Sequence, residues 1–307
     1  MFPILKLIRY QNLLMLAFMQ LVFRYAFFKI QDIPLALADW QYGLLVLSTV
    51  LIAAGGYVIN NILDQKTDAI NKPNNVIIGK NISETNAYTV YMALTVAGVL
   101  IGFYLSNVIL KPSFAAVFIL IAATLYLYAT SLKQILIVGN SIVAILLSCS
   151  VIIIGIFDLL PAIDAGNQQQ MRIVFSILLD YAIFTFFINM LREIIKDIED
   201  VDGDYNQGIR TLPIVIGKSR TAKIVFGLSF VPILLLLYYI NSYLLNLIYT
   251  TIYLLLFVMG PLFYFTVKVW SAQTKKEFYT LSLLLKWIMF FGILSVVIIS
   301  INIKYNA

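Results

Sequence analysis

The sequence predicts an all-α integral membrane protein with nine transmembrane helices. Of its 307 residues, 62% are hydrophobic and only 12% are charged, whereas a soluble domain carries about 25% charged residues. The mean hydropathy is +0.94. The apolar residues form long runs without the strict alternation of barrel strands. Because backbone in lipid must satisfy its own hydrogen bonds, these runs are expected to be helices.

Nine apolar segments are separated by charged or turn-like stretches. Each is long enough to cross a hydrocarbon core, which takes about 20 residues. The N-terminal stretch continues into the first segment without a small-residue cleavage site, so we expect no removable signal peptide. Residues 1–307 are expected to form a single polytopic domain. The segments are placed at residues 11–30, 42–61, 86–107, 114–132, 136–157, 173–196, 221–240, 246–268 and 280–302.

Cationic residues predict the orientation. With nine spans, the N-terminus and the loops after spans 2, 4, 6 and 8 share one side, which carries sixteen Lys and Arg against five on the other. By the positive-inside rule, that side is expected to face the cytoplasm. The protein is expected to be integral to the cell (inner) membrane. The net charge of +6 is explained by these loops, so no nucleic-acid partner is expected.

Two residue counts exclude several kinds of chemistry. The chain has no histidine, which excludes histidine metal sites, histidine general bases and Ser-His-Asp triads. Its single cysteine, Cys149, excludes an internal disulfide framework.

Acidic residues are concentrated in two stretches on the predicted cytoplasmic side. More than half of the fifteen Asp and Glu lie in residues 60–73 and 192–204, at the ends of spans 2 and 6. Carboxylates at a membrane edge are costly and indicate a functional site. Polar residues in each stretch recur every three or four positions, so they share a helical face. They are Asn60, Asn61, Asp64 and Asp68 in the first stretch and Glu193, Asp197, Asp200 and Asp204 in the second.

The composition of the two clusters predicts a magnesium site. Like charges at this spacing repel unless a cation lies between them. Oxygen ligands without His or Cys favour Mg²⁺, which binds through a few carboxylates together with substrate phosphates. Two facing clusters would hold one or two ions against a diphosphate, with Lys and Arg adding counter-charge. The alternative is that both stretches are solvated charged loops. That interpretation is weaker, because two clusters with helical spacing lie on the same side of the membrane.

The other acids are expected to be structural. Asp180, inside the sixth span, is interpreted as a packed polar contact. We expect Asp32, Asp39, Asp158 and Asp164 to be loop residues on the far side.

The two clusters resemble the signature motifs of the UbiA superfamily of membrane prenyltransferases. Residues 60–68 read N-N-I-L-D-Q-K-T-D and residues 197–204 read D-I-E-D-V-D-G-D, similar to the family patterns N-D-x-x-D-x-x-x-D and D-x-x-D-x-x-x-D. The similarity covers nearly the whole chain and implies a nine-helix bundle with a central prenyl-diphosphate cavity. Further similar positions are Arg9 and Asn12 at the start of span 1, and Tyr128, Lys133 and Asn140 around the loop after span 4.

The resemblance implies Mg²⁺-dependent transfer of a polyprenyl group from its diphosphate to a hydrophobic acceptor from the membrane. The C–O bond would break to leave an allylic cation and a negatively charged diphosphate. The metal and cationic residues would stabilise the charge on the diphosphate, and a water-poor pocket would keep water from capturing the cation. The implied catalytic residues are Asp64, Asp68, Asp197 and Asp200. The implied metal ligands are these four with Asn61 and Asp204. The implied substrate-binding residues are Asn12, Arg9, Asn60, Asn61, Lys72, Tyr128, Lys133 and Lys196.

The chain departs from the family pattern in the first motif and around it. Asn61 stands where the family usually has Asp, and an amide oxygen can still coordinate a metal, so altered affinity is expected. Tyr10 replaces a usual proline, and Asn75 with Val76 replaces a second Arg-Pro pair after Lys72 and Pro73.

Several acceptors and functions stay open. The closest resemblance is to the geranylgeranylglycerol-phosphate geranylgeranyltransferase branch, which implies a geranylgeranyl group and an ether-lipid product. The motifs bind the diphosphate that all branches share, so an aromatic quinone precursor or a chlorophyllide-type acceptor is an alternative. A cation-coupled transporter is an alternative of another class, although transporter sites lie near the bilayer midplane. An inert prenyl-lipid binding protein would also keep both clusters. The sequence does not indicate an oligomeric state.

Overall fold

The computed structural model describes residues 3–71, 76–206 and 208–306. In these ranges nine helices are long and apolar enough to cross a membrane, which confirms the predicted class and span count. Several spans continue through a π-helical or 3₁₀ turn. The spans are α2 (Tyr10–Leu21) with η1 (Val22–Phe28), α3 (Asp39–Leu63), α5 (Glu84–Val108), η3 (Pro112–Phe114) with α6 (Ala115–Thr130), α7 (Val138–Ile154) with η5 (Gly155–Leu159) and η6 (Leu160–Ala162), α8 (Gln168–Asn206), α10 (Lys218–Tyr239) with η7 (Ile240–Leu244), α11 (Ile248–Leu254) with η8 (Leu255–Met259) and α12 (Gly260–Ser271), and α13 (Lys275–Asn306).

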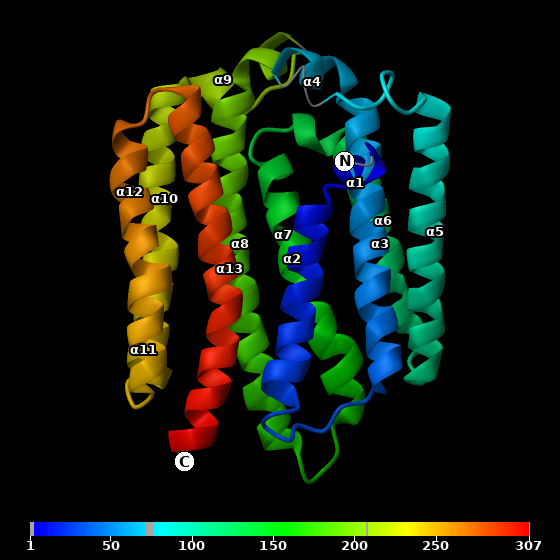
Figure 1. Cartoon of the computed structure of the whole chain (residues 1–307), viewed down its shortest axis with the longest axis vertical. Coiled ribbons are helices and arrows are strands. Elements are labelled where there is room, and N and C mark those ends of the chain that lie inside the picture. Colours follow the sequence, from blue (N-terminus) through cyan, green and yellow to red (C-terminus); the bar gives the residue numbers. More distant parts are fainter. Residues whose placement is uncertain (1–2, 72–75, 207, 307) are drawn as a thin grey trace.

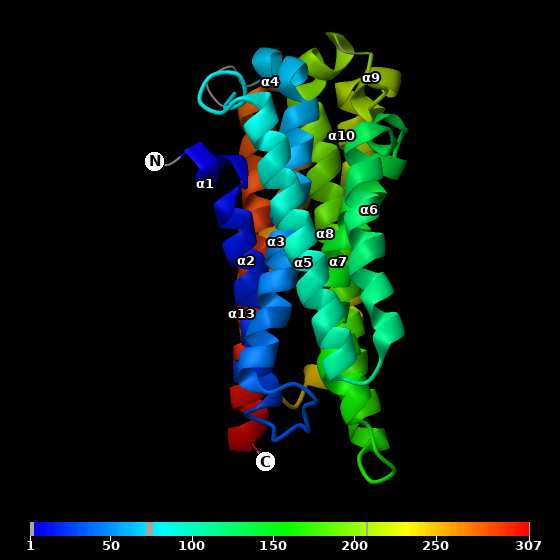
Figure 2. The same ribbon diagram turned by 90° about the vertical axis from the view of Figure 1, so that its right-hand side faces the viewer.

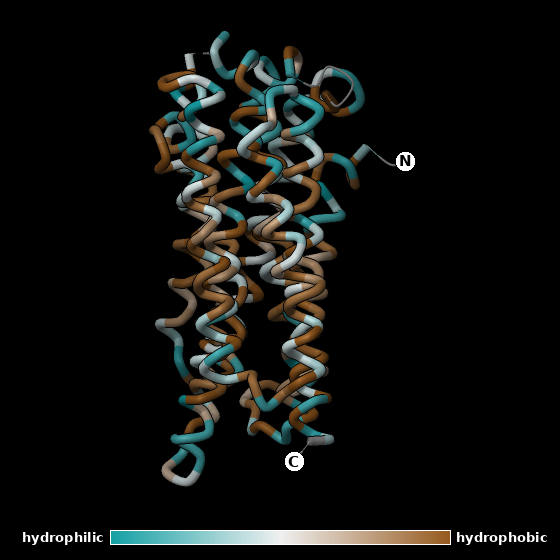
Figure 3. The backbone as a smooth tube through the Cα atoms, turned by 90° about the vertical axis from the view of Figure 1, so that its left-hand side faces the viewer, coloured by the Kyte–Doolittle hydropathy of each residue, from teal (hydrophilic) through white to brown (hydrophobic). Residues whose placement is uncertain are grey.

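The spans stand side by side in one elongated bundle (Figures 1 and 2). Two short helices, α4 (Gln65–Asn71) and α9 (Leu212–Ile216), lie over one end, which we call the capped end. The first helix, α1 (Pro3–Leu7), lies near this end, whereas α13 finishes at the opposite end. Hydrophobic residues dominate the middle of the bundle and hydrophilic residues gather at its ends (Figure 3). This is the distribution of a multi-pass membrane protein.

The sixth span is longer than its hydropathy predicts. We expected it to end at residue 196, but α8 has 39 residues and continues to Asn206. At 1.5 Å per residue it is about 58 Å long, against a hydrocarbon core of about 30 Å. The extension packs against α4 and α9 and buries Ile198 and Val201. Hydropathy reports where a helix leaves the apolar core, not where tertiary contacts extend it.

The first motif lies on two helices instead of one. The long helix α3 ends at Leu63, Asp64 has φ −91° and ψ 7°, and α4 begins at Gln65. The Asp68 N–H still donates to the Asp64 carbonyl at 2.8 Å. The chain therefore bends at Asp64 without losing that hydrogen bond.

A buried ion pair joins two spans at the end opposite the capped end. Arg24 of η1 contacts the carboxylate of Asp158 in η5, and both side chains are almost fully buried. Arg24 also bonds to the Leu37 carbonyl at 2.6 Å, and Leu37 donates its N–H to Asp158 at 3.0 Å. The expectation that Asp158 is a loop residue is wrong, because Asp158 lies in η5 and is buried against Arg24. A buried charge requires partners of this kind. Asp39, expected in the same loop class, is the first residue of α3.

Candidate active site

A polar cavity of about 490 Å³ lies at the capped end, and we call it the polar chamber. It is built where α1, α3, α4, α8 and α13 converge, so it brings together residues far apart in the sequence. The predicted site residues that line it are Arg9, Asn60, Asn61, Asp64, Asp68, Tyr128, Lys133, Lys196, Asp197, Asp200 and Asp204. Asn12 lines an adjoining apolar cavity instead. Lys72, together with Pro73 and Asn75, lies outside the described residues.

Asp64 is the centre of the first motif's contacts. Its carboxylate forms an ion pair with Lys133, which η4 (Leu132–Gln134) positions after the fourth span. It also accepts a hydrogen bond from Asn60 Nδ2 at 2.7 Å. The Asn60 Oδ1 atom is buried and has no hydrogen-bond partner in the described part of the chain. A buried amide oxygen of this kind is suited to accept from, or coordinate, a bound group.

Asn61 is held by the backbone. Its Nδ2 donates to the Tyr57 carbonyl at 2.7 Å and to the Leu7 carbonyl at 3.2 Å. Because both bonds need the amide nitrogen, a carboxylate could not make them. The side chain therefore ties α1 to α3. Asn61 also lines the polar chamber.

The second motif lies on the extension of α8. Asp197 accepts a hydrogen bond from Asn140 Nδ2 of α7 at 2.8 Å. Asn140 belongs to the sequence resemblance, and the structure gives it a direct contact with the motif. Asp200 and Asp204 follow on the same helix, and both line the polar chamber.

Asn71 joins the two motif regions. Its Nδ2 donates to the Asp200 carbonyl and its Oδ1 accepts from the Gly203 N–H, each at 2.8 Å. A Cβ atom at position 203 would lie 2.4 Å from Asn71 Nδ2. A glycine in the second motif is therefore required for α4 to approach α8. Sequence reasoning missed Asn71, because nothing local marks a residue whose partners are more than a hundred positions away.

Basic residues form a third group in the polar chamber, in addition to the two motifs. Arg9 has φ 51°, an uncommon conformation for a non-glycine residue, where α1 turns into α2. Its guanidinium lies 5.3 Å from the centre of the Tyr57 ring, whose hydroxyl accepts from Asn12 at 3.2 Å. Lys196 bonds to Glu193 at 2.5 Å. The chamber also takes in Lys6, Arg192 and Lys286, which were not predicted.

The unpredicted cations differ in how they could have been found. Arg192 lies one turn before Lys196 on α8, so its spacing to that predicted lysine could have indicated it. Lys286 lies on the ninth span, and no sequence spacing connects it with either motif. Only the packing of α13 against α8 brings it to the chamber.

The donor set fits a hard cation held together with a phosphate. Among the described residues, no group of three or more acids surrounds one common metal position. The chamber nevertheless presents carboxylate and amide oxygens from both motifs and no His or Cys. Mg²⁺ is commonly bound by one or two carboxylates, with phosphates and waters completing its octahedron. The side chains therefore suit Mg²⁺ that would be held together with a substrate phosphate.

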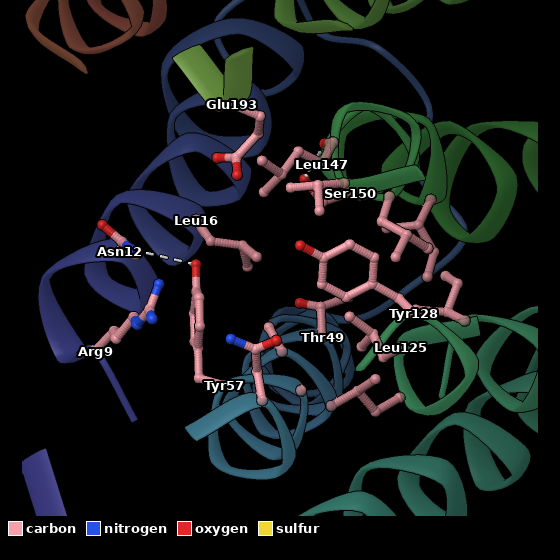
Figure 4. Close-up of a pocket in the computed structure, with 18 of the residues that line it drawn as sticks. Arg9, Asn12, Leu16, Thr49, Tyr57, Leu125, Tyr128, Leu147, Ser150 and Glu193 are labelled. Atoms are coloured by element: carbon pink, nitrogen blue, oxygen red, sulfur yellow. Dashed lines mark hydrogen bonds between the residues drawn. The ribbon is translucent and has the colours of Figure 1, made fainter. Parts of the chain in front are cut away.

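An apolar cavity of about 150 Å³ opens from the polar chamber into the bundle, and we call it the first apolar cavity. Its walls include Leu16, Leu125 and Leu147 (Figure 4). In that view Tyr57 and Tyr128 lie on opposite sides of the cavity. Six residues line both spaces, namely Arg9, Asn60, Tyr128, Arg192, Glu193 and Lys196. A polar chamber continuous with an apolar cavity fits a molecule with a charged head and a hydrocarbon chain.

Comparison with known proteins gives one family. The model of the UbiA prenyltransferase family matches residues 15–299. A digeranylgeranylglyceryl phosphate synthase of Methanobrevibacter smithii is 32% identical over 263 residues, 84% of this chain and 86% of that protein. The one of Methanoculleus marisnigri is 35% identical over 184 residues, 60% of each chain. The match thus spans less than two thirds of several of these relatives, including that of Korarchaeum cryptofilum, at 32% identity and 59% of its length.

Solved structures show the same fold. A structure reported for digeranylgeranylglyceryl phosphate synthase in membranes superposes with a TM-score of 0.66 at 20% identity, covering 97% of this chain and 98% of the other. A UbiA homolog from Archaeoglobus fulgidus, bound to DMAPP and Mg²⁺, gives a TM-score of 0.59 at 14% identity, with 95% and 98% covered. At these identities the likeness establishes the fold.

Proposed function

The chain belongs to the UbiA prenyltransferase family, and on that premise we propose that it transfers a geranylgeranyl group from its diphosphate to geranylgeranylglyceryl phosphate, forming an ether lipid. The observation that carries this proposal is that both acidic motifs line one polar chamber, which opens into an apolar cavity. The names of the relatives support this acceptor. We take residues 1–307 to act as one polytopic domain.

The diphosphate head group is assigned to the polar chamber. In this proposal the metal ligands are Asn61, Asp64, Asp68, Asp197, Asp200 and Asp204. Arg9, Lys133 and Lys196 contact the phosphate oxygens, because ammonium and guanidinium groups form strong charge-assisted hydrogen bonds to phosphate. Lys133, now paired with Asp64, would exchange that carboxylate for a phosphate. Lys72 keeps its assignment from its place in the sequence.

The first apolar cavity is assigned to the donor's hydrocarbon chain. Tyr128 and Asn60 line both this cavity and the polar chamber, so they would flank the bond between C1 of the chain and the diphosphate. Asn12 would hold Tyr57 in place through its hydrogen bond to the hydroxyl. The apolar walls exclude water, which would otherwise capture the developing allylic cation.

The transfer replaces one C–O bond by another. The bond between C1 and the diphosphate breaks, and its electron pair leaves with the diphosphate. The acceptor's hydroxyl oxygen forms the new bond to C1, and its proton passes to the released diphosphate. Mg²⁺, when bound, supplies charge stabilisation for the leaving group. The Arg9, Lys133 and Lys196 side chains add to that stabilisation.

Transfer assays test this proposal. Purified protein in detergent, given Mg²⁺ and labelled geranylgeranyl diphosphate, is expected to prenylate geranylgeranylglyceryl phosphate. Aromatic quinone precursors and a chlorophyllide, offered separately, are expected to remain unmodified. Transfer to one of these acceptors, with none to the glyceryl phosphate lipid, would overturn the proposed acceptor. Absence of any transfer, with cation-dependent transport in vesicles, would favour the transporter.

We also propose that the capped end faces the cytoplasm in the inner cell membrane. The asymmetry of the Lys and Arg residues supports this orientation. Two exposed positions allow a test, Ser219 near the capped end and Ala165 at the other. In a Cys149→Ser background, Ser219→Cys is expected to react with an impermeant maleimide only after the cells are opened. Ala165→Cys is expected to react in intact spheroplasts, and the reverse pattern would overturn the orientation.

A further inference from the structure

A second apolar cavity of about 120 Å³ also leaves the polar chamber, and it lies among α2, α7, α8 and α13. Its hydrophobic lining includes Met15, Met19, Phe184 and Met289. It adjoins the first apolar cavity, since Leu16 and Leu147 line both. The chamber therefore connects with two neighbouring apolar spaces. A donor and an acceptor that each carry a hydrocarbon chain need two such spaces.

Two cations stand where the second apolar cavity meets the polar chamber. Arg192 and Lys286 are the residues that line both. Arg192 lines the first apolar cavity as well, so it lies at the junction of all three spaces. An anionic head group bound at this junction could carry a hydrocarbon chain that lies in the second apolar cavity.

Both cations lack a full set of partners among the described residues. The Arg192 side chain is only 15% exposed, and its single ion pair is with Glu193 at 3.6 Å. Its Nε is buried without a hydrogen bond to any described residue. Lys286, half-buried on α13, makes no hydrogen bond or ion pair within the described ranges, and it lines the same two spaces as Arg192. Two like charges held together in a low-dielectric site favour a bound anion.

The direction of Arg192 on α8 separates it from the metal-binding face. Five positions along a helix of 3.6 residues per turn correspond to a rotation of roughly 140°, so Arg192 points away from Asp197. On its own side it continues a stripe that lines the second apolar cavity, formed by Tyr181, Phe184, Thr185, Asn189 and Arg192. The stripe is about 16 Å long, with the cation at its polar end.

The second apolar cavity continues to the surface that faces lipid. Tyr181, Phe184 and Gly292 line both it and a third cavity of about 170 Å³. The third cavity is bordered by Tyr238 and Tyr243, which are exposed on the flank of the bundle. A chain longer than the second cavity could therefore extend into the bilayer.

We propose that Arg192 and Lys286 form a second anion site, which binds the phosphate monoester of the acceptor lipid while its chain lies in the second and third cavities. This rests on the proposed function. A phosphate monoester carries about −1.5 to −2 charge at pH 7, which two cations balance, and an Arg can bind it through two parallel hydrogen bonds. The acceptor hydroxyl then lies near Arg192, beside the head-group end of the first apolar cavity.

Kinetics with each substrate varied separately test the site. Lys286→Met and Arg192→Gln are expected to raise the KM for geranylgeranylglyceryl phosphate at least tenfold, because each removes charge-assisted hydrogen bonds. The KM for geranylgeranyl diphosphate should change less than about twofold, and Lys286→Arg should retain most acceptor affinity. Lys276→Met, an exposed lysine on α13 outside the chamber, is the matched control and should behave as wild type.

A second acceptor distinguishes a binding site from a general structural effect. Geranylgeranylglycerol lacks the phosphate, so wild-type protein should strongly prefer the phosphorylated lipid, and Lys286→Met should lose most of that preference. Wild-type melting temperatures for both variants would exclude misfolding. An unchanged preference in folded variants, or an equal rise in both KM values, would overturn the second anion site alone. Failure of wild-type protein to use the glyceryl phosphate lipid would overturn the proposed function first.

Discussion

Asn71 and Gly203 are joined by a 2.8 Å hydrogen bond from the Gly203 N–H to Asn71 Oδ1. The bond ties α4, which carries Asp68, to the α8 extension that carries the second motif. The same amide group donates to the Asp200 carbonyl. The spacing between the two motifs therefore depends on the Asn71 side chain and on the absence of a side chain at position 203.

Gly203→Ala is expected to lower the rate of prenyl transfer. The added methyl group would lie 2.4 Å from Asn71, so α4 must move, and a displacement of about 1 Å at a reaction centre can cost about 100-fold in rate. Steady-state kinetics measure the effect. Gly227→Ala is the matched control, because a Cβ at this helical position meets nothing within 4 Å. Equal rates for the two variants would show that α4 does not position the site.

Removal of the metal or of a motif charge is expected to abolish transfer. EDTA should stop product formation and added Mg²⁺ should restore it, because the leaving diphosphate loses its counter-charge. Asp197→Asn preserves the side-chain shape and should lower kcat/KM at least about 100-fold. The control is Asp164→Asn, in an exposed loop at the far end. Undiminished transfer in EDTA would contradict the metal-dependent mechanism.

Asn61→Asp, which restores the usual family residue, is expected to destabilise this protein. The carboxylate would face the Leu7 and Tyr57 carbonyls that Asn61 now donates to, and unsatisfied buried polar groups cost about 1–3 kcal/mol. Thermal unfolding in detergent should therefore show a lower Tm for Asn61→Asp than for the wild-type protein.

A matched control exists for that substitution. Asn107 also donates to a carbonyl four residues earlier, at 2.8 Å, but it is exposed. Asn107→Asp should therefore leave the Tm nearly unchanged. A higher Tm for Asn61→Asp would show that the amide contacts are unimportant.

The Arg24–Asp158 ion pair is expected to affect stability and not chemistry. Asp158→Ala leaves a buried guanidinium without its main partner, which costs about 3–5 kcal/mol. The double variant Arg24→Met/Asp158→Leu should lose less. Asp39→Ala removes the other, 57% exposed partner of Arg24 and should have little effect. A loss of stability in Asp39→Ala as large as in Asp158→Ala would contradict this assignment.

Features that depend on local composition could be predicted from the sequence alone. Long apolar runs predicted nine helices, because lipid leaves the backbone no other way to satisfy its hydrogen bonds. Helical spacing predicted the second motif, since all four of its predicted residues lie on α8. Residue types predicted a hard-metal and phosphate chemistry, because ligand preference belongs to the side chain and not to its surroundings.

Features that depend on contacts between distant segments could not be predicted in this way. The helix α8 continues beyond the apolar core because α4 and α9 pack against it, and Asp158 is buried because Arg24 faces it. Lys286 joins the polar chamber, and Asn61 ties α1 to α3 instead of simply replacing a metal ligand. Hydropathy and spacing describe one helix at a time, whereas each of these contacts exists only once two helices are packed together.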